Sequence, residues 1–350
     1  TFAIRSVDDD FADVLKNFYD PFASLLSCVT TVEKEGRTQS YDHLLNDLYD
    51  TILDARELPN HKILRIRGAS GTDKNALTQL LYLRLANETR SGYEEGYAPY
   101  YLNLNHYCTG RYASADDAKK QLELDAEPFL SYCKTHPNRI PILFVDGVKK
   151  YELDDFNLDY CLSAVMSELP NTKFVVAIED GLVINSRRQR DPAAFAAGRF
   201  LCHVKMEPLY LPGRDEAMRF LESFTKIYGG ADPESIYNNL RRIGFQQIDT
   251  YQLRMCLGKD FGNLSRAGNL AHLYQLICNE RLAGEQALME QGEQWAFDFA
   301  YTSVPLPPVP RALKRLLSAH DSLQEFFIAR WYLSRLRDDS LSANELSMVM

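Results

Sequence analysis

Eight consecutive residues have the residue types of a phosphate-binding loop. Such a loop follows the pattern G-x-x-x-x-G-K-[ST]: its backbone N–H groups surround phosphates at a helix N-terminus, and its lysine reaches the β- and γ-phosphates. The segment and its candidate nucleotide-binding residues are Gly68, Ala69, Ser70, Gly71, Thr72, Asp73, Lys74 and Asn75. The first glycine and the lysine match the pattern, and they predict a nucleotide site.

Two positions of the loop depart from the pattern. Asp73 stands where the second glycine belongs, and Asn75 stands where the Mg²⁺-binding hydroxyl belongs. A carboxylate beside the phosphates and an amide in place of the hydroxyl both predict weakened binding of triphosphate and metal. An ordinary turn, in which Thr72 or Asp73 caps the following helix, also fits these residues.

A second candidate site ends the apolar run Ile142–Val145, which is followed by Asp146 and Gly147. Phosphate-loop enzymes place an aspartate at the end of a buried strand, where it holds the Mg²⁺ shell. Asp146 is therefore a candidate nucleotide-binding residue and metal ligand. It fits equally well as a strand-terminal residue that begins a turn with Gly147. Lys149 and Lys150 follow, so no general base is evident and no catalytic residue is assigned.

Alternating strand and helix patterns place these residues in an α/β domain. A mostly parallel sheet covered on both faces is expected. We expect helices over residues 11–54, interrupted at Gly36, and an all-helical region after Pro212. Between them, the patterns predict strands over 62–67, 100–104, 140–146, 172–178 and 201–206 and helices over 74–87, 116–133 and 156–169.

Composition excludes several classes of protein. With 39 Lys and Arg against 48 Asp and Glu, the net charge is −9, so we expect no nucleic-acid partner. Seven cysteines without a C-x-x-C pair favour a reducing, cytoplasmic location. No apolar run is long enough for a bilayer, so no membrane partner is expected. Because the chain begins at Thr1 and stops after a helical pattern, we expect it to be part of a longer protein.

In their order, these pieces resemble the NACHT branch of the STAND P-loop ATPases. Gly68, Gly71, Lys74, Asp146 and Gly147 match its nucleotide motifs, and the segment 320–333, HDSLQEFFIARWYL, looks like the family's H-x-S-F-Q-E-F-F-A-A-x-Y-L segment. The family's histidine approaches the β-phosphate of bound ADP, so the resemblance implies this role for His320. Core packing is the alternative, because Leu316, His320, Leu323 and Phe327 share one helical face.

The departures from the family point to lost hydrolysis. The strand 173–179 occupies the place of the family's sensor strand, which usually ends in T-S-R. Here Ile178 and Glu179 stand at that end, so the strand has no arginine there for the γ-phosphate. Asp73, Asn75, Lys149 and Glu179 alter four catalytic positions together.

The resemblance implies four regions: an N-terminal helical region (1–55), a P-loop NTPase α/β core (56–211), a helical lid (212–283) and a winged-helix-like helical region (284–350). It implies a conformational switch or scaffold that binds ADP or ATP, with Mg²⁺ weak or absent, in a larger signalling protein. Other protein domains or self-association are the expected partners, and bacterial members often serve in defence. A nucleotide-free scaffold and a small-molecule P-loop kinase are the alternatives, the latter disfavoured by Asn75. A DNA-binding winged helix is opposed by the acidic charge.

Overall fold

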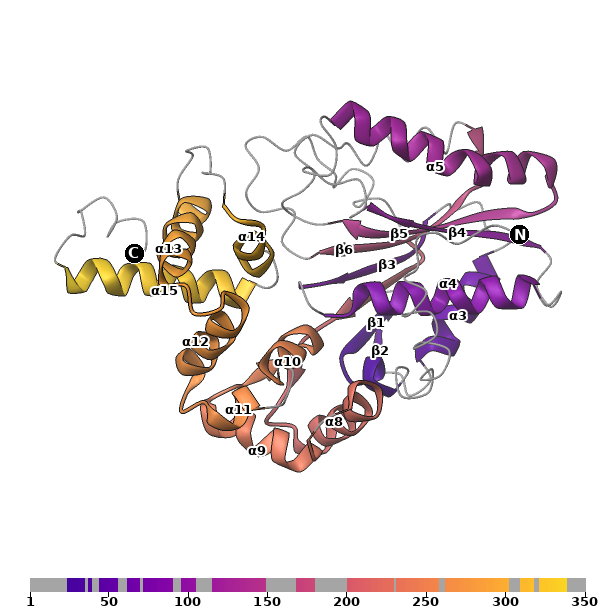
Figure 1. The fold of residues 1–350 in the computed structure, drawn as a ribbon. Coiled ribbons are helices and arrows are strands. Elements are labelled where there is room, and N and C mark those ends of the chain that lie inside the picture. The colour runs from indigo at the N-terminus through magenta and orange to yellow at the C-terminus, as the bar shows by residue number, and fades with distance from the viewer. Residues whose placement is uncertain are drawn as a thin grey trace. The chain divides into compact units, whose positions relative to one another are not determined.

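The protein is described by a computed structural model, whose elements are drawn in Figure 1. By their contacts they divide into two compact units, one holding Thr1–Leu209 with Asp215–Gly229 and the other holding Tyr210–Arg214 with Gly230–Met350. The described residues are 24–34, 37–39, 44–55, 62–69, 72–90, 96–104, 115–148, 168–179, 200–229, 231–257, 262–301, 309–317 and 321–338.

The first unit is built on a seven-stranded sheet with the order β2-β1-β7-β3-β6-β5-β4. Five of these strands, from β7 to β4, run parallel to one another, and β1 pairs antiparallel with both β2 and β7. The predicted α/β core with a mostly parallel sheet is confirmed. The strands are β1 (Thr30–Lys34), β2 (Arg37–Gln39), β3 (Lys62–Gly68), β4 (Tyr97–Asn103), β5 (Ile140–Val148), β6 (Lys173–Glu179) and β7 (Cys202–Met206).

Helices lie on both faces of this sheet. Figure 1 shows α3 (Leu44–Asp54) and α4 (Lys74–Arg90) on one face and α5 (Ala115–Thr135) on the other. Because successive side chains of a strand point to opposite faces of the sheet, β4 contacts the helices on both faces. The Tyr97 hydroxyl donates to Leu53 O at the end of α3 (2.9 Å), whereas the neighbouring Tyr100 stacks on Phe129 of α5 with ring centroids 4.8 Å apart. The core thus forms two layers, one on each side of the strands.

A fourth helix, α8 (Arg214–Tyr228), belongs to the first unit by its contacts. Its buried face carries Phe220, Leu221 and Phe224, and its Ser223 hydroxyl donates to Ser24 Oγ (3.0 Å). The predicted lid begins at residue 212 and would include α8, whereas the contacts group α8 with the first unit. The three predicted domain boundaries stay a prediction.

The N-terminal region differs from the expected run of helices over residues 11–54. Its described part contains α3 but also the β1–β2 hairpin, at Thr30–Lys34 and Arg37–Gln39. The β-branched run Thr30, Thr31 and Val32 suits a strand. All five residues of β1 pair with β7, a partner about 170 positions away that local periodicity does not reveal. Residues 1–23 lie outside the described part.

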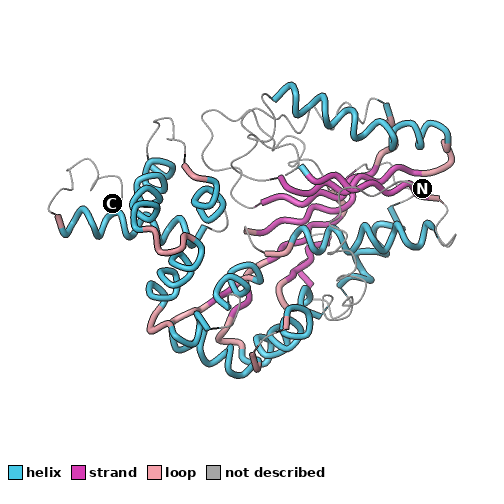
Figure 2. The backbone as a smooth tube through the Cα atoms, viewed as in Figure 1, coloured by secondary structure: helices cyan, strands magenta, loops and turns pink. Residues whose placement is uncertain are grey.

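The second unit is mainly helical, as Figure 2 shows by the cyan tube over residues 231–338. The two-residue strands β8 (Leu209–Tyr210) and β9 (Gln247–Ile248) pair with each other in a second, two-stranded sheet. The helices are α9 (Pro233–Ile243), α10 (Thr250–Leu257), α11 (Gly262–Arg266), α12 (Leu270–Arg281), α13 (Gln286–Tyr301), α14 (Arg311–Leu317) and α15 (Asp321–Arg337). The described part of the region predicted as winged-helix-like contains the helices α13, α14 and α15.

Local signals set the ends of α9. Asp232 accepts from the backbone N–H of Ser235 (3.0 Å), Pro233 occupies the first turn, and Gly244 ends the helix in the left-handed conformation at φ 101°. These are the residue types that begin and end helices in general.

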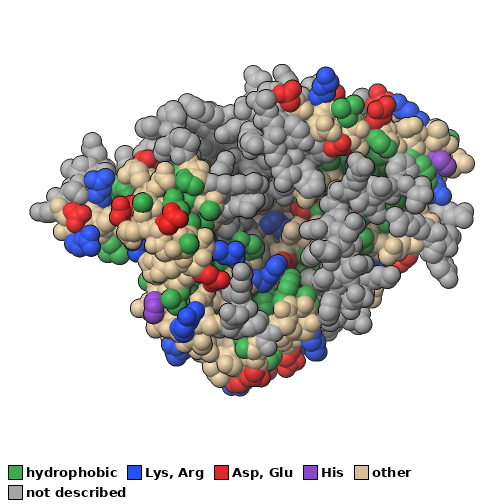
Figure 3. All heavy atoms as spheres, viewed as in Figure 1, with side chains coloured by type: hydrophobic (Ala, Val, Ile, Leu, Met, Phe, Trp, Pro, Cys, Tyr) green, Lys and Arg blue, Asp and Glu red, His purple; other side chains and the backbone are tan. Residues whose placement is uncertain are grey.

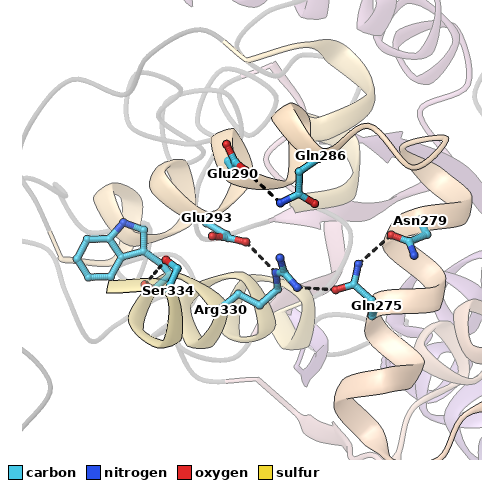
Figure 4. Close-up of polar contacts among 8 residues, drawn as sticks. Gln275, Asn279, Gln286, Glu290, Glu293, Arg330 and Ser334 are labelled. Carbon is cyan, nitrogen blue, oxygen red and sulfur yellow. Dashed lines mark hydrogen bonds and ion pairs between the residues drawn. The ribbon is translucent and has the colours of Figure 1, made fainter. Parts of the chain in front are cut away.

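An aromatic and a charged contact join the helices of the second unit. Phe297 of α13 stacks on Trp331 of α15 with ring centroids 3.7 Å apart. The guanidinium of Arg330, the residue before Trp331, donates to Glu293 Oε1 on α13 (2.8 Å) and to Gln275 Oε1 on α12 (2.6 Å). Figure 4 shows Arg330 between these two partners. One side chain of α15 therefore fixes two other helices.

No helix in the described ranges is long and apolar enough to cross a membrane. On the face drawn in Figure 3, acidic and basic side chains are interspersed over the described helices.

Candidate functional site

The predicted phosphate loop joins β3 to α4 at the carboxyl edge of the parallel strands. β3 lies between β6 and β7, and its last residue, Gly68, pairs with Glu179 and Met206. α4 begins six residues later, at Lys74. Open parallel sheets bind ligands at this edge, in the loops that follow the strands. The structure thus places the loop where the motif requires it.

Gly68 has no room for a side chain. A Cβ at this position would lie 2.5 Å from the backbone oxygen of Met206 and 2.5 Å from Thr72 Oγ1. Real Cβ contacts do not reach such distances, and the first of these neighbours is backbone. Glycine is required here because β7 and the end of the loop approach the chain closely.

The loop is held together by its own side chains. The buried Thr72 hydroxyl donates to Ala69 O (2.8 Å). The Lys74 ammonium donates to the same carbonyl (2.5 Å), and its Nζ lies 3.5 Å from Thr72 Oγ1. The Lys74 side chain is therefore turned back toward the end of β3, with its ammonium beside Ala69 O and Thr72 Oγ1.

Asp73, which stands where the motif has its second glycine, has a positive φ. Its φ of 56° lies in the left-handed region, which aspartate enters more readily than most residues but less readily than glycine. Its carbonyl accepts from the N–H of Leu77 (3.0 Å) and so starts α4. Asp73 thus combines a left-handed backbone conformation with a carboxylate at the start of α4.

Asp146 lies on β5, at the same edge of the sheet and two strands away from the loop strand. It sits in an irregularity of the β5–β6 pairing, between Val145 and Val148, and its side chain is buried. The Tyr101 hydroxyl donates to Asp146 Oδ2 (2.6 Å), and Gln79 Nε2 donates to the Tyr101 oxygen (3.0 Å). These three side chains form a chain that runs from α4 through β4 to β5.

Tyr101 is a permanent donor in this chain. Its burial, reinforced by the charge and hydrogen bond of Asp146, raises the pKa of Tyr101 well above its ordinary value. The hydroxyl therefore keeps its proton at any pH that the fold survives. Tyr101 and Gln79 were not among the candidate residues, because no local pattern shows that β4 pairs with β5; only that pairing puts Tyr101 beside Asp146.

The donor set fits Mg²⁺ poorly. Magnesium takes six oxygen ligands in a near-octahedral arrangement and usually keeps several waters, held by one or two carboxylates and the phosphates. Here Asn75, exposed in the first turn of α4, offers an amide in place of the motif's hydroxyl, and one oxygen of Asp146 accepts a hydrogen bond from Tyr101. The part of the chain that the structure describes contains no group of three or more His, Cys, Asp or Glu side chains able to hold a metal.

The structure brings together only part of the predicted site. Described near one another are the end of β3 and the start of α4, with Gly68, Ala69, Thr72, Asp73, Lys74 and Asn75, and Asp146 lies at the same sheet edge. Ser70, Gly71 and His320 lie outside the described residues, as do Lys149, Lys150 and most of the predicted helix 156–169. Their roles stay predictions.

No protein-family model and no curated protein matches the chain. Solved structures with a similar course of the chain include the origin recognition complex of Drosophila bound to DNA, with a TM-score of 0.38, 14% identity and coverage of 82% of this chain and 73% of that one. The ADP form of ORC2 from Aeropyrum pernix has a TM-score of 0.39 and 11% identity, with coverage of 82% and 83%. AMPPCP-bound DnaA from Aquifex aeolicus has 0.39 and 12%, with coverage of 86% and 90%. Values this low do not establish a shared family or function.

Proposed function

We propose that the β3–α4 loop binds a nucleotide, ADP or ATP, and that binding controls the conformation of a larger protein. The observation that carries this proposal is the Lys74 ammonium, held over the loop on Ala69 O at 2.5 Å, at the start of a helix that follows a parallel strand. A phosphate oxygen is a stronger partner for an ammonium than a carbonyl is, because both groups are charged. Phosphate would therefore displace the carbonyl.

Two residues of the loop, Asp73 and Asn75, favour a diphosphate over a triphosphate. ADP requires neither a metal nor a group that senses a γ-phosphate, and this loop has Asn75 in place of the metal-binding hydroxyl. The Asp73 carboxylate opposes each added phosphate charge. We expect ADP to bind at least as tightly as ATP.

Calorimetry with both nucleotides, with and without Mg²⁺, tests the site. Lys74→Ala should weaken ADP binding by roughly tenfold or more, about 1.4 kcal/mol, because it removes the cation that faces the phosphates. Lys226→Ala is the matched control, since it removes an exposed lysine from α8 in the same unit. Much tighter Mg²⁺-dependent ATP binding, or an ADP affinity indifferent to Lys74, would contradict the proposal.

The proposal includes weak or absent hydrolysis. Lys149, Lys150 and Glu179 stand where acids and an arginine would position water and neutralise the γ-phosphoryl group. Phosphate release should stay near the uncatalysed rate. Robust release that Lys74→Ala abolishes would show that the chain has catalytic groups beyond those named.

His320 belongs to the proposal only through the family resemblance. If it donates to the β-phosphate, His320→Ala should weaken ADP binding by roughly 1 to 3 kcal/mol, the usual cost of losing a hydrogen bond to a charged group. A core role would instead lower the melting temperature of the nucleotide-free protein and leave the ADP affinity unchanged. His320→Gln keeps a donor and helps separate the two.

A nucleotide-free scaffold is the second candidate, and one observation favours it. The Thr72 hydroxyl and the Lys74 ammonium already have an acceptor within the chain, since both donate to Ala69 O. Mass spectrometry of the purified protein distinguishes the two functions. Copurified ADP or ATP supports the switch, whereas absence of nucleotide together with no heat of ADP binding supports the scaffold. The role in a NACHT-type signalling protein, and any partner protein, rests on the resemblance alone.

A further inference from the structure

Three basic residues lie together on one face of the large sheet. Arg67 of β3 is directly opposite Lys205 in the parallel pairing of β3 with β7. Arg65, two residues earlier on β3, points to the same face, because side chains alternate along a strand. Like charges opposite each other on paired strands are destabilising. The Arg67–Lys205 pair therefore lowers the stability of the sheet that contains it.

The register of the strands shows which face this is. Leu64 of β3 pairs with Val175, Val175 pairs with Phe144, and the Phe144 ring contacts Tyr82 of α4. Paired residues of parallel strands share a face, so Leu64 faces α4. The two arginines alternate with Leu64 and therefore face the opposite side, on which α5 lies (Figure 1). The basic residues and the Lys74 helix are thus on different sides of the sheet.

The strands beside Arg67 do not offer its guanidinium an acceptor. On β6, Ile178 is opposite Arg67 and Val176 is opposite Arg65, and both of these apolar side chains are buried. The Nε of Arg67 is also buried, and it has no hydrogen-bond acceptor in the part of the chain that the structure describes. A buried donor without an acceptor destabilises the folded state, most of all when the donor is charged.

Lys205 has one partner on its own strand's extension. Its ammonium forms an ion pair with Glu207, and the two side chains are 44% and 49% exposed. Across β7, Thr31 and Glu33 of β1 are in register with Lys205 and His203. An exposed ion pair contributes little to stability, so an incoming anion can compete for this ammonium.

The chemistry of the three groups indicates the kind of ligand. Each arginine presents N–H donors in a planar fork that fits an oxyanion through two parallel bonds, and the lysine presents a compact charge. Arg65 and Arg67 are about 7 Å apart along their strand, and Lys205 is one strand, about 5 Å, to the side. Donors from three positions suit the four oxygens of phosphate better than the two oxygens of a carboxylate. Arg67 and Lys205 also lie near the carboxyl edge of the strands, where open sheets bind ligands.

We propose that Arg65, Arg67 and Lys205 bind an oxyanion of the phosphate class, of which inorganic phosphate and pyrophosphate are the simplest members. The anion supplies the acceptor that the Arg67 Nε lacks and offsets the repulsion between Arg67 and Lys205. This site goes beyond the proposed nucleotide site, because it is on the opposite face of the sheet and does not depend on nucleotide binding.

Calorimetry with pyrophosphate tests the site in Lys74→Ala protein, which lacks the ammonium of the nucleotide loop. Adding Arg67→Gln should weaken pyrophosphate binding by roughly tenfold or more, the scale of a lost hydrogen bond to a charged group. Arg219→Gln is the matched control, because it makes the same change at an exposed position of α8 in the same unit, and it should leave the affinity unchanged. Absence of binding to Lys74→Ala protein, or equal affinities of the Arg67 and Arg219 variants, would overturn the proposal.

Thermal unfolding in buffer without multivalent anions separates ligand binding from a structural role of Arg67. Arg67→Gln should melt at the wild-type temperature or up to about 2 to 4 °C higher, because it removes a buried donor without an acceptor and a charge opposite Lys205. A lower melting temperature would show that the protein itself binds the guanidinium, and the proposal would fail.

Pyrophosphate should also raise the melting temperature of Lys74→Ala protein but not of the Lys74→Ala/Arg67→Gln variant. Equal stabilisation by sodium chloride at the same ionic strength would reduce the effect to screening and overturn the proposal. The nucleotide proposal is judged separately, since ADP binding should weaken with Lys74→Ala and persist with Arg67→Gln.

Discussion

Asp73 joins two opposing properties in one residue. Its backbone has a left-handed conformation, at φ 56°, at the position where the motif has glycine, but its side chain adds a negative charge beside the place proposed for phosphate. A backbone conformation that suits glycine and an added carboxylate therefore meet at one position of the proposed site.

Asp73→Gly should tighten ADP binding by roughly tenfold, about 1.4 kcal/mol, because it removes a like charge close to the phosphates. Stability should change little. The left-handed strain that glycine relieves, about 1 kcal/mol or less for aspartate, is offset by the greater freedom of glycine in the unfolded chain. Calorimetry and thermal melting measure the two effects.

Asp73→Asn is the control for this substitution. Asparagine also tolerates the left-handed region, so it removes the charge and keeps the backbone preference. Both variants should gain affinity alike. A gain confined to glycine would show that backbone freedom, rather than charge, limits the site.

At the residue scale, the sequence could predict the loop but not the surroundings of Asp146. Gly68 and Lys74 are recognisable because the motif is local and continuous along the chain. Tyr101 looks like any apolar-facing residue of a strand, and it meets Asp146 only because β4 pairs with β5 so that Asn103 lies opposite Asp146. Pairings of this kind are set by the packing of the whole sheet.

At the scale of elements, Gly292 determines how closely three helices of the second unit pack. A Cβ on this residue of α13 would lie 2.7 Å from Phe327 of α15 and 3.0 Å from Leu313 of α14. The helices therefore meet over a bare stretch of backbone, and the large side chain of Phe327 fills the space that a small residue leaves.

Gly292→Ala should destabilise the second unit by roughly 1 to 3 kcal/mol, because overpacking of a filled core forces helices or side chains to shift. Helix propensity alone predicts the opposite sign, since alanine is favoured over glycine by about 1 kcal/mol. Thermal unfolding decides between them. Gly262→Ala on α11 is the control, because its nearest neighbour would be the flexible Arg266 side chain at 3.5 Å.

The predicted elements succeed where one pattern spans the whole element. The strand expected over 140–146 is β5 (Ile140–Val148), and the helix expected over 116–133 is α5 (Ala115–Thr135). The hairpin of β1 and β2 was not predicted, because its strands are five and three residues long and lie among helical patterns. β1 pairs along its whole length with β7, and local sequence patterns do not show that these two distant strands meet.

At the scale of the whole molecule, the two units predict two thermal transitions. Gly68→Ala should lower one of them, because its Cβ would overlap the backbone of β7, and Gly292→Ala should lower the other. Changes in separate cores, with no shared contact, act additively. Differential scanning calorimetry of both single variants and the double variant measures this. A single transition that moves as a whole with either substitution would show that the chain unfolds as one unit.

The pairing of β1 with β7 has a consequence for how the chain folds during synthesis. β1 ends at Lys34, and its partner strand begins only at Cys202. At about 5 to 20 residues per second, β1 leaves the ribosome roughly 10 to 30 seconds before β7 exists. β3 waits in the same way for both of its neighbours, β6 and β7. Until residue 206 emerges, the edges of β1 and β3 that pair with β7 have no native partner, and such edges are where chains aggregate. The interval before β7 is made is therefore a stage of synthesis at which two strand edges of this protein are open to wrong pairing.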